Sequence, residues 1–168
     1  PKPVVAAVEG PAYGAGTALA LACDRVVAAD DATFATTFTG VGLAGDMGIF
    51  ASLPARVGGP RARQMLMMGT RVKGAEAGPI GLVDRVVEPG EALATALEDA
   101  AVLAAGPPLA LGVIKQMLSG EPRHPLAVLD LEVRNQTQLW DSDDFAEGVS
   151  AFAEKRRPVF GTTPDQEP

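Results

Sequence analysis

A glycine-rich turn at residues 14–16 is the first place where this sequence could do chemistry. Gly14, Ala15 and Gly16 follow an apolar run, residues 3–8, that is typical of a buried strand, and they precede an Ala- and Leu-rich segment typical of a helix. The turn would therefore present the unpaired backbone N–H groups of a helix start, with almost no side chain in front of them. Such groups attract an anion, or an oxygen on which negative charge develops during a reaction. The same glycines could instead serve only a tight turn, and the pattern alone leaves both interpretations open.

Asp46 is the only acidic residue in a glycine-rich loop that the sequence predicts over residues 39–47. A single carboxylate can take a proton from one carbon atom and return it to another, which is the chemistry that shifts a double bond. Alternatively, Asp46 could form an Asx turn or cap the helix that begins near Gly48.

Four large side chains lie close to these two groups in the sequence: Tyr13, Phe38, Met47 and Phe50. They could line an apolar pocket for the apolar part of a substrate. They could equally be ordinary members of the hydrophobic core, and Tyr13 could form a local hydrogen bond.

The densest basic cluster is Lys155-Arg156-Arg157. Its charges could bind an anionic group, which makes Lys155 a candidate substrate contact. The alternative is that these charges complement the C-terminal end of a helix. The chain as a whole has a net charge of −7, which argues against non-specific nucleic-acid binding.

The elements that must position these groups divide into an α/β part and a helical part. Alternating apolar runs and helical periods predict strands over 4–8, 25–29, 33–38 and 82–87, and helices over 14–24, 49–56, 60–68 and 73–80. After residue 90 only helical spacing recurs, over 91–105, 107–118, 126–140 and 145–152, with Ser142 or Asp143 as the N-cap of the last helix. We expect Pro54 to bend or end its helix.

Short segments also follow one another at characteristic spacings: 10–24, 33–34, 41–48, 53–58, 68–71, 75–77, 81–84 and 148–160. In this order they resemble the crotonase (enoyl-CoA hydratase/isomerase) superfamily, from residue 2 to about residue 160. The resemblance implies an α/β fold with a crotonase-like layered β/α core (a ββα-type superhelix), followed by a helical C-terminal oligomerisation region. It implies domains at 1–87 and 88–160, and we expect a disordered tail at 161–168.

The same resemblance implies chemistry on an acyl-CoA thioester through its enolate. Ala15 N–H would be an oxyanion donor, and Asp46 falls where several isomerases of the family keep an acidic proton shuttle. The two glutamates of the family's hydratases fall at Ala18 and Phe38, which can act neither as acid nor as base. We therefore expect double-bond isomerisation ahead of hydration. A hydratase with atypical acids and a non-catalytic binding or scaffold subunit are the alternatives.

The resemblance further implies a homotrimer or hexamer, no metal and no redox cofactor, with coenzyme A present only as part of the substrate. It places the second oxyanion donor, with roughly the first third of the family's length, upstream of Pro1. We therefore expect residues 1–168 alone to be inactive.

The remaining features are less specific. A single cysteine, Cys23, fits a reducing compartment, and no apolar run is long enough to span a membrane, so a cytoplasmic location is expected. His124 has no partners at metal-ligand spacing. A dinucleotide-binding turn is a further alternative for Gly14 and Gly16, but its third position is Leu19, and it does not account for the residues after 33.

Overall fold

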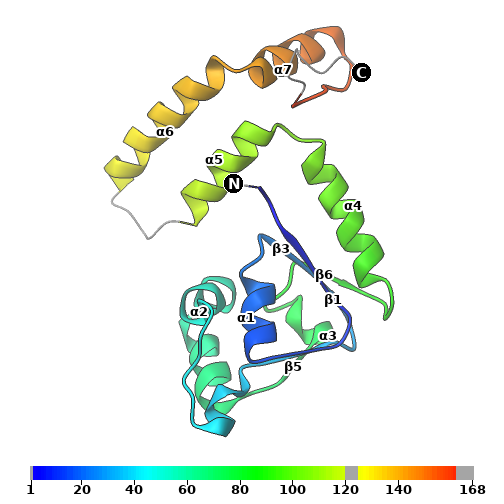
Figure 1. The fold of residues 1–168 in the computed structure, drawn as a ribbon, viewed down its shortest axis with the longest axis vertical. Helices are drawn as coiled ribbons and strands as arrows, with labels where there is room; N and C mark the ends of the chain where they lie inside the picture. The colour runs from blue at the N-terminus through cyan, green and yellow to red at the C-terminus, as the bar shows by residue number, and fades with distance from the viewer. Residues whose placement is uncertain (1, 120–124, 162–168) are drawn as a thin grey trace. The chain divides into compact units, whose positions relative to one another are not determined.

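The computed structural model describes residues 2–119 and 125–161, which form two compact units. The first unit is Val4–Ala100, and the second comprises Ala101–Pro168 with Pro1–Pro3. Figure 1 shows their helices and strands in chain order. The predicted tail from residue 162 onward, and His124, lie outside the described residues.

The first unit contains six short strands and the helices between them. Its elements are β1 (Val5–Val8), β2 (Pro11–Tyr13), α1 (Ala15–Leu21), β3 (Arg25–Ala29), β4 (Thr33–Ala35), the 3₁₀ helix η1 (Thr37–Val41), α2 (Ile49–Met68), β5 (Val72–Lys73), α3 (Gly74–Ala77), β6 (Arg85–Val87) and the first turns of α4 (Ala92–Ala104).

Two three-stranded sheets organise this unit. In the sheet β1-β3-β6 all neighbours are parallel, with Val5 opposite Arg25 and Val27 opposite Arg85. In the sheet β2-β4-β5, β2 and β4 are parallel, whereas β4 and β5 are antiparallel. The apolar run of β3 is buried from Val26 onward, as expected for a parallel strand that is covered on both faces.

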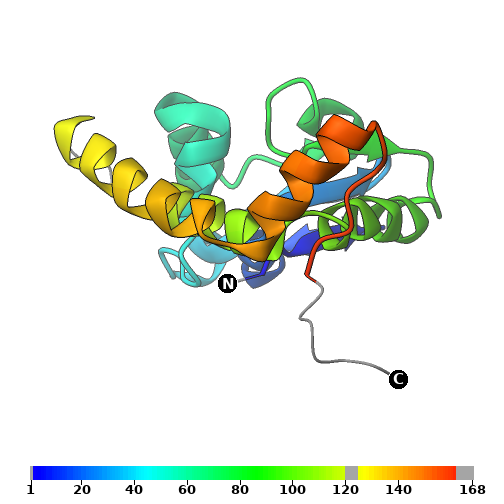
Figure 2. The same ribbon diagram turned by 90° about the horizontal axis from the view of Figure 1, so that it is seen from above.

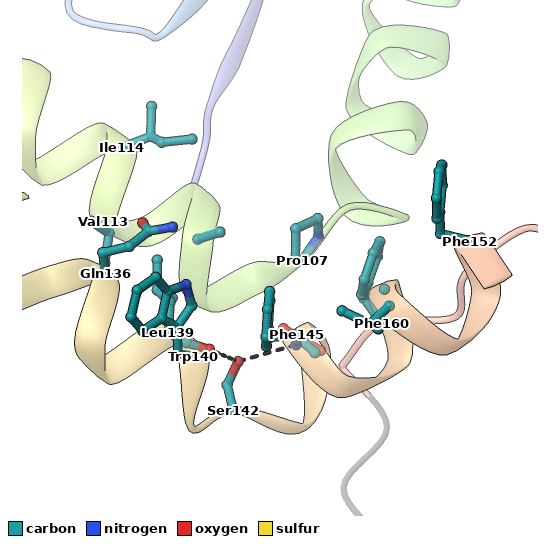
Figure 3. A pocket seen from close by; sticks show the side chains of 14 residues that line it. Pro107, Val113, Ile114, Gln136, Leu139, Trp140, Ser142, Phe145, Phe152 and Phe160 are labelled. Carbon is teal, nitrogen blue, oxygen red and sulfur yellow. Dashed lines mark hydrogen bonds between the residues drawn. The ribbon is translucent and has the colours of Figure 1, made fainter.

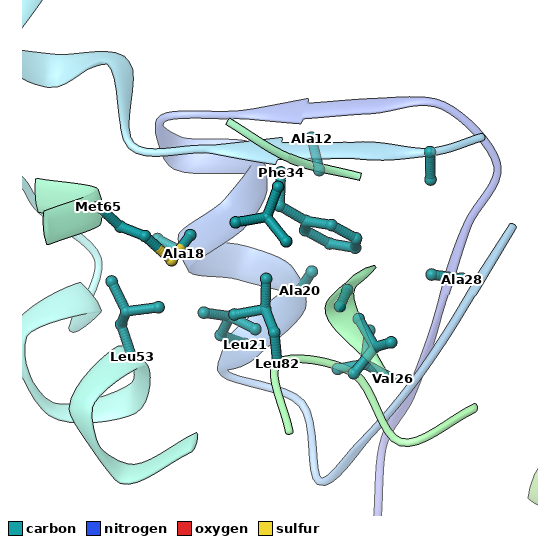
Figure 4. Packing of buried hydrophobic residues seen from close by; sticks show 14 of the residues in the cluster. Ala12, Ala18, Ala20, Leu21, Val26, Ala28, Phe34, Leu53, Met65 and Leu82 are labelled. Carbon is teal, nitrogen blue, oxygen red and sulfur yellow. The ribbon is translucent and has the colours of Figure 1, made fainter. Parts of the chain in front are cut away.

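The main hydrophobic core draws on both sheets and on α1 and α2 (Figure 4). Phe34, Leu53 and Met65 are its largest fully buried members together with Ile49 and Leu82. Small side chains dominate α1, where Ala18 and Ala20 are buried, so the helix can approach its neighbours closely. A second, smaller cluster joins Val27 of β3 to Ala92 and Ala96 of α4.

Several expectations about this unit need correction. The predicted strand over 82–87 begins only at Arg85, and the predicted helix over 73–80 is limited to Gly74–Ala77. Pro11–Tyr13 is a strand that the sequence did not predict, and α1 ends at Leu21 rather than near Asp24. The predicted strand over 33–38 stops at Ala35, because the chain turns into a 3₁₀ helix after Thr36. Helix α2 runs through Pro54 and breaks instead at Gly58, whose φ of 74° and ψ of 161° are not helical.

The second unit consists of the end of α4 and three further helices, α5 (Pro108–Leu118), α6 (Pro125–Trp140) and α7 (Asp143–Glu154), shown in Figures 1 and 2. Ser142 is the N-cap of α7, as predicted, since its hydroxyl accepts the Phe145 N–H at 3.2 Å. After α7 the chain folds back along that helix. Glu147 accepts the Val159 N–H, and Asp144 accepts the Gly161 N–H.

An apolar cavity of about 540 Å³ lies within the second unit, between α5, α6 and α7 (Figure 3). Trp140, Phe145, Phe152 and Phe160 supply its aromatic lining. None of the predicted site residues lines it.

Among the described residues, no single helix is long and apolar enough to cross a membrane. The pair α4 and α5 together has the length and apolar composition of a membrane span, but the two helices are bent by 110° relative to one another.

Candidate functional site

Hydrogen bonds to main-chain carbonyl groups hold the turn between β2 and α1 in place. Gly14 has φ 52° and ψ −115°, a conformation available essentially to glycine. Its N–H donates to the Ala35 carbonyl at 2.8 Å. The buried Thr17 hydroxyl contacts the same carbonyl at 3.1 Å, and it also donates to the Ala12 carbonyl. The strand register explains this arrangement, because β2 and β4 lie side by side with Tyr13 opposite Ala35.

The N–H of Ala15 opens α1. No side chain caps this helix, and its first turn contains no acidic residue. Among the described residues, no carbonyl outside the helix accepts the Ala15 N–H. A first-turn N–H without an acceptor is the group that a developing oxyanion requires.

Phe38 lies next to the turn. A Cβ built on Gly14 would be 3.7 Å and 3.8 Å from two carbons of the Phe38 ring. The ring is 8% exposed and belongs to the main core. Ala18, on the next turn of α1, is fully buried. The structure thus brings Gly14 and Phe38 together in an apolar environment without a carboxylate from either of the positions 18 and 38.

Asp46 lies in the irregular loop before α2 and is exposed. Its backbone carbonyl accepts the Ile49 N–H at 3.1 Å, but the N-cap of α2 is Gly48, and no side chain caps that helix. Within the described part of the chain, no hydrogen bond or ion pair engages the Asp46 carboxylate. The capping role that was one interpretation of Asp46 is therefore absent, and no contact joins Asp46 directly to Ala15.

The other apolar candidates surround the loop only in part. Phe50 packs against Gly45, where a built Cβ would be 3.3 Å from its ring. Phe50 and Met47 are more than half exposed, and Tyr13 is 39% exposed. Three of the four predicted wall residues thus offer apolar surface outside the core, whereas Phe38 is part of it.

Lys155 belongs to the second unit, at the end of α7, where it has a φ of 56°. Its neighbour Arg156 forms ion pairs with Glu147 and Glu154. The Arg156 side chain is the main cause that lowers the pKa of Glu147 to about 2, with help from the Val159 N–H. Of the ion pairs that the structure describes, none includes Lys155 or Arg157, so these two charges of the cluster are left for another group.

Three residues of the first unit with clear contacts escaped the sequence analysis: Thr17, Glu9 and Arg71. Thr17 supports the turn, and Glu9 accepts N–H groups at the start of α4. The Arg71 guanidinium lies over the Tyr13 ring. Each role depends on pairing between segments that are far apart in the sequence, except that Thr17 follows Gly14 on the same helix and could have been noticed there.

The sequence model of the family described as Enoyl-CoA hydratase/isomerase matches residues 1–163. The chain is 43% identical over 161 residues to the "Probable enoyl-CoA hydratase" of Rhodobacter capsulatus, covering 95% of this chain and 63% of that protein. It is 40% identical to the 1,2-epoxyphenylacetyl-CoA isomerase of Escherichia coli K12, covering 95% of this chain and 62% of that protein.

Among solved structures, an enoyl-CoA hydratase from Mycobacterium tuberculosis H37Rv superposes with a TM-score of 0.91 at 35% identity, covering 96% of this chain and 65% of the other. The fold is therefore that of the crotonases, with the expected α/β core and helical C-terminal region. The chain spans about 63% of the length of the R. capsulatus relative. The dinucleotide-binding alternative accounts for none of these matches. By sequence and by fold, this chain belongs to the enoyl-CoA hydratase/isomerase family.

Proposed function

We propose that this protein moves a carbon–carbon double bond of an acyl-CoA thioester from the β,γ to the α,β position. One observation carries the proposal. Ala18 and Phe38, where the resemblance places the two glutamates of the hydratases, are buried and have no acidic group, whereas the Asp46 carboxylate is exposed and engaged by no described partner. A reaction that needs a single carboxylate suits this set of residues.

The proposed reaction transfers one proton twice. The Asp46 carboxylate removes a proton from the α-carbon of the β,γ-unsaturated thioester, and the electron pair delocalises onto the thioester oxygen as a dienolate. The protonated Asp46 then donates the same proton to the γ-carbon, and the conjugated thioester forms. No water is added and no group leaves, so atoms and electrons balance with Asp46 regenerated.

Ala15 N–H would stabilise the dienolate. The Gly14 turn holds this N–H at a helix start, and the hydrogen bonds to the Ala35 carbonyl fix its direction before the substrate binds. A dipole that is already oriented stabilises developing charge without reorganising. Gly14 and Gly16 leave room for the thioester to approach the main chain.

The acyl chain would lie against the apolar side chains around the turn and the loop. Tyr13, Met47 and Phe50 supply partly exposed apolar surface, and Phe38 closes the space behind Gly14. We assign the phosphates of coenzyme A to Lys155, whose charge no described carboxylate neutralises. The names of the relatives support an acyl-CoA substrate, because the E. coli relative is an isomerase of 1,2-epoxyphenylacetyl-CoA.

The test is Asp46→Asn in the complete protein encoded by the gene. Isomerisation of a β,γ-unsaturated acyl-CoA, followed by the absorbance of the conjugated thioester, should fall about 100-fold or more, because the amide cannot carry the proton. Asp31→Asn, at an exposed turn between β3 and β4, is the matched control and should keep full activity. Isomerisation that survives in Asp46→Asn would remove this residue from the mechanism.

A second candidate function is binding of acyl-CoA without catalysis, and the lack of acids at Ala18 and Phe38 favours it. In that case the protein should bind a saturated acyl-CoA but neither isomerise β,γ-unsaturated thioesters nor hydrate α,β-unsaturated ones. Hydration by atypical acids would instead yield a β-hydroxyacyl-CoA. Calorimetry with product analysis therefore separates the three possibilities.

A further inference from the structure

Tyr13 and Arg71 form a cation–π pair on the sheet β2-β4-β5. The guanidinium carbon of Arg71 lies 5.6 Å from the centroid of the Tyr13 ring. This is within the roughly 6 Å range in which a cation is attracted to the face of an aromatic ring.

The strand register explains why the two side chains meet. Tyr13 lies opposite Ala35, and the antiparallel pairing of Phe34 with Val72 brings Arg71 level with Ala35 when it is continued by one residue. Ala35 contributes only a methyl group and is fully buried. The Arg71 side chain can therefore extend across the middle strand β4 and reach the Tyr13 ring on β2.

The pair borders the proposed oxyanion donor. Tyr13 immediately precedes Gly14, and the proposed function assigns its ring to the wall of the acyl site. Of the ion pairs in the described part of the chain, none involves Arg71. The described partner of its charged end is the Tyr13 ring, which remains 39% exposed and so keeps surface for a ligand.

We propose that Arg71 is a positioning residue that holds the Tyr13 ring as a wall of the acyl site. This inference rests on the proposed function, because it assigns Tyr13 to substrate contact. A wall contacts the acyl chain equally in the bound substrate and in the transition state. Loss of its support therefore raises KM and leaves kcat unchanged. Disruption of the turn itself would displace the Ala15 N–H and lower kcat instead.

The kinetic test compares Arg71→Met, Arg71→Lys and Tyr13→Leu in the complete protein. Arg71→Met keeps an apolar stem but loses the charge, and it should raise both KM and the Kd of a saturated acyl-CoA about 2- to 5-fold, which corresponds to a cation–π interaction at an exposed site. Arg71→Lys keeps a cation and should restore most of the affinity. In a Tyr13→Leu background, Arg71→Met should have no further effect. An equal effect with and without the Tyr13 ring would overturn the proposal, because Arg71 would then act on the ligand independently.

A second readout does not depend on activity. Tyr13 is the only tyrosine of the chain, so its ring signals in an NMR spectrum of tyrosine-labelled protein are identified by their loss in Tyr13→Leu. These signals should move in Arg71→Met and much less in Arg71→Lys. Ring signals that stay unchanged in Arg71→Met overturn the positioning role, whether or not the enzyme is active. Absence of isomerisation in the wild type, with the expected ring shifts and Kd changes, overturns the proposed reaction and leaves the positioning role supported.

Discussion

Gly14 is the residue on which the geometry of the turn depends most directly. Its φ of 52° with ψ of −115° is strained for any residue that carries a Cβ. The space around it is not the obstacle, because a built Cβ would meet its nearest neighbour, Thr37 Oγ1, at an ordinary 3.5 Å. The need for glycine at this position is therefore conformational.

Gly14→Ala should destabilise the protein by about 1–3 kcal/mol, the cost of holding alanine in that conformation. Urea unfolding measures the change. Gly10→Ala is the control, because its φ is not in the left-handed region and a built Cβ there meets nothing within 4 Å. Equal destabilisation by both substitutions would contradict the conformational explanation.

At the residue scale, the sequence predicted the turn and the helix start better than the side chains that pack around them. The turn at Gly14 and the helix start at Ala15 lie where the apolar run and the glycines placed them. The Phe38 ring beside Gly14 was not foreseeable in that detail, because it depends on how η1 is placed against the Gly14 turn. The part of Asp46 in catalysis stays a prediction, as do those of Tyr13, Met47, Phe50 and Lys155.

At the scale of elements, one carboxylate joins a strand end to a helix start. Glu9, just after β1, accepts the N–H groups of Gly90, Ala92 and Leu93 at the beginning of α4. The hydrogen bond from Gly90 is the largest cause that lowers the pKa of Glu9 below its ordinary value of 4.5. A negative charge at a helix start is favourable, so Glu9 serves as a cap supplied from a distant part of the sequence.

Glu9→Gln should loosen the first turn of α4, because the amide carries no charge and offers only one acceptor oxygen. Amide hydrogen exchange at Ala92 and Leu93 should speed up. Glu98→Gln, an exposed change on the same helix, should leave these amides unaffected. In the wild type, the contribution of Glu9 is complete above pH 4.5 and is lost as the pH falls through the lowered pKa. The Gln variant should lack this dependence.

The segment after α7 is held by a second carboxylate. Glu147 binds the Arg156 guanidinium through both oxygens and also accepts the Val159 N–H. Since its pKa is lowered from 4.5 to about 2, its contribution is complete above pH 4.5 and disappears between that pH and about 2.

Glu147→Gln should therefore speed amide exchange at Val159 at neutral pH, and in the wild type the same amide should exchange faster as the pH drops below 4.5, after correction for intrinsic rates. Glu132→Gln, on the exposed surface of α6, is the control. An unchanged Val159 exchange rate in Glu147→Gln would show that Arg156 and Glu147 do not hold this segment.

Most of the long helices and the apolar strands β1 and β3 were predictable, whereas several short elements were not. The helices α4, α5 and α7 lie within a residue or two of the predicted ranges, or extend them, because their apolar spacing and caps are local signals. Strand β2 was missed because it is only three residues long and contains Pro11. It exists because β4 offers a partner, and a single-sequence pattern contains no information on that pairing.

At the scale of the whole molecule, the helices of the second unit expose large apolar side chains. Val133 and Phe152 are 67% and 88% exposed, and Phe152 also lines the cavity between α5, α6 and α7. Exposed apolar area of this kind usually marks an interface. The trimer or hexamer that the family resemblance implies stays a prediction, and these helices are the surface through which we expect it to assemble.

Light scattering of the complete protein should give a mass that is a multiple of three subunits. Phe152→Asp should shift this mass toward the monomer, since burying a charge in an apolar contact is costly. Gln138→Asp, at an exposed position of α6, should not change it. A monomeric wild type would refute the assembly.

The division at residues 87 and 88, and the inactivity expected of residues 1–168 alone, remain predictions about the complete protein. Limited proteolysis of the complete protein would test the domain boundary. An isomerase assay that compares residues 1–168 with the complete protein would test the inactivity.

The hydrogen bonds that hold the turn at Gly14 and Ala15 are accepted by two main-chain oxygens, those of Ala12 and Ala35. A point mutation replaces a side chain and leaves every peptide oxygen in place, so no single codon change can delete either acceptor. A substitution can therefore disturb the turn only by replacing Thr17 or Gly14, or by placing a larger side chain against it. In a mutational scan, tolerance at positions 12 and 35 should therefore follow side-chain volume, whereas position 17 should tolerate serine better than valine.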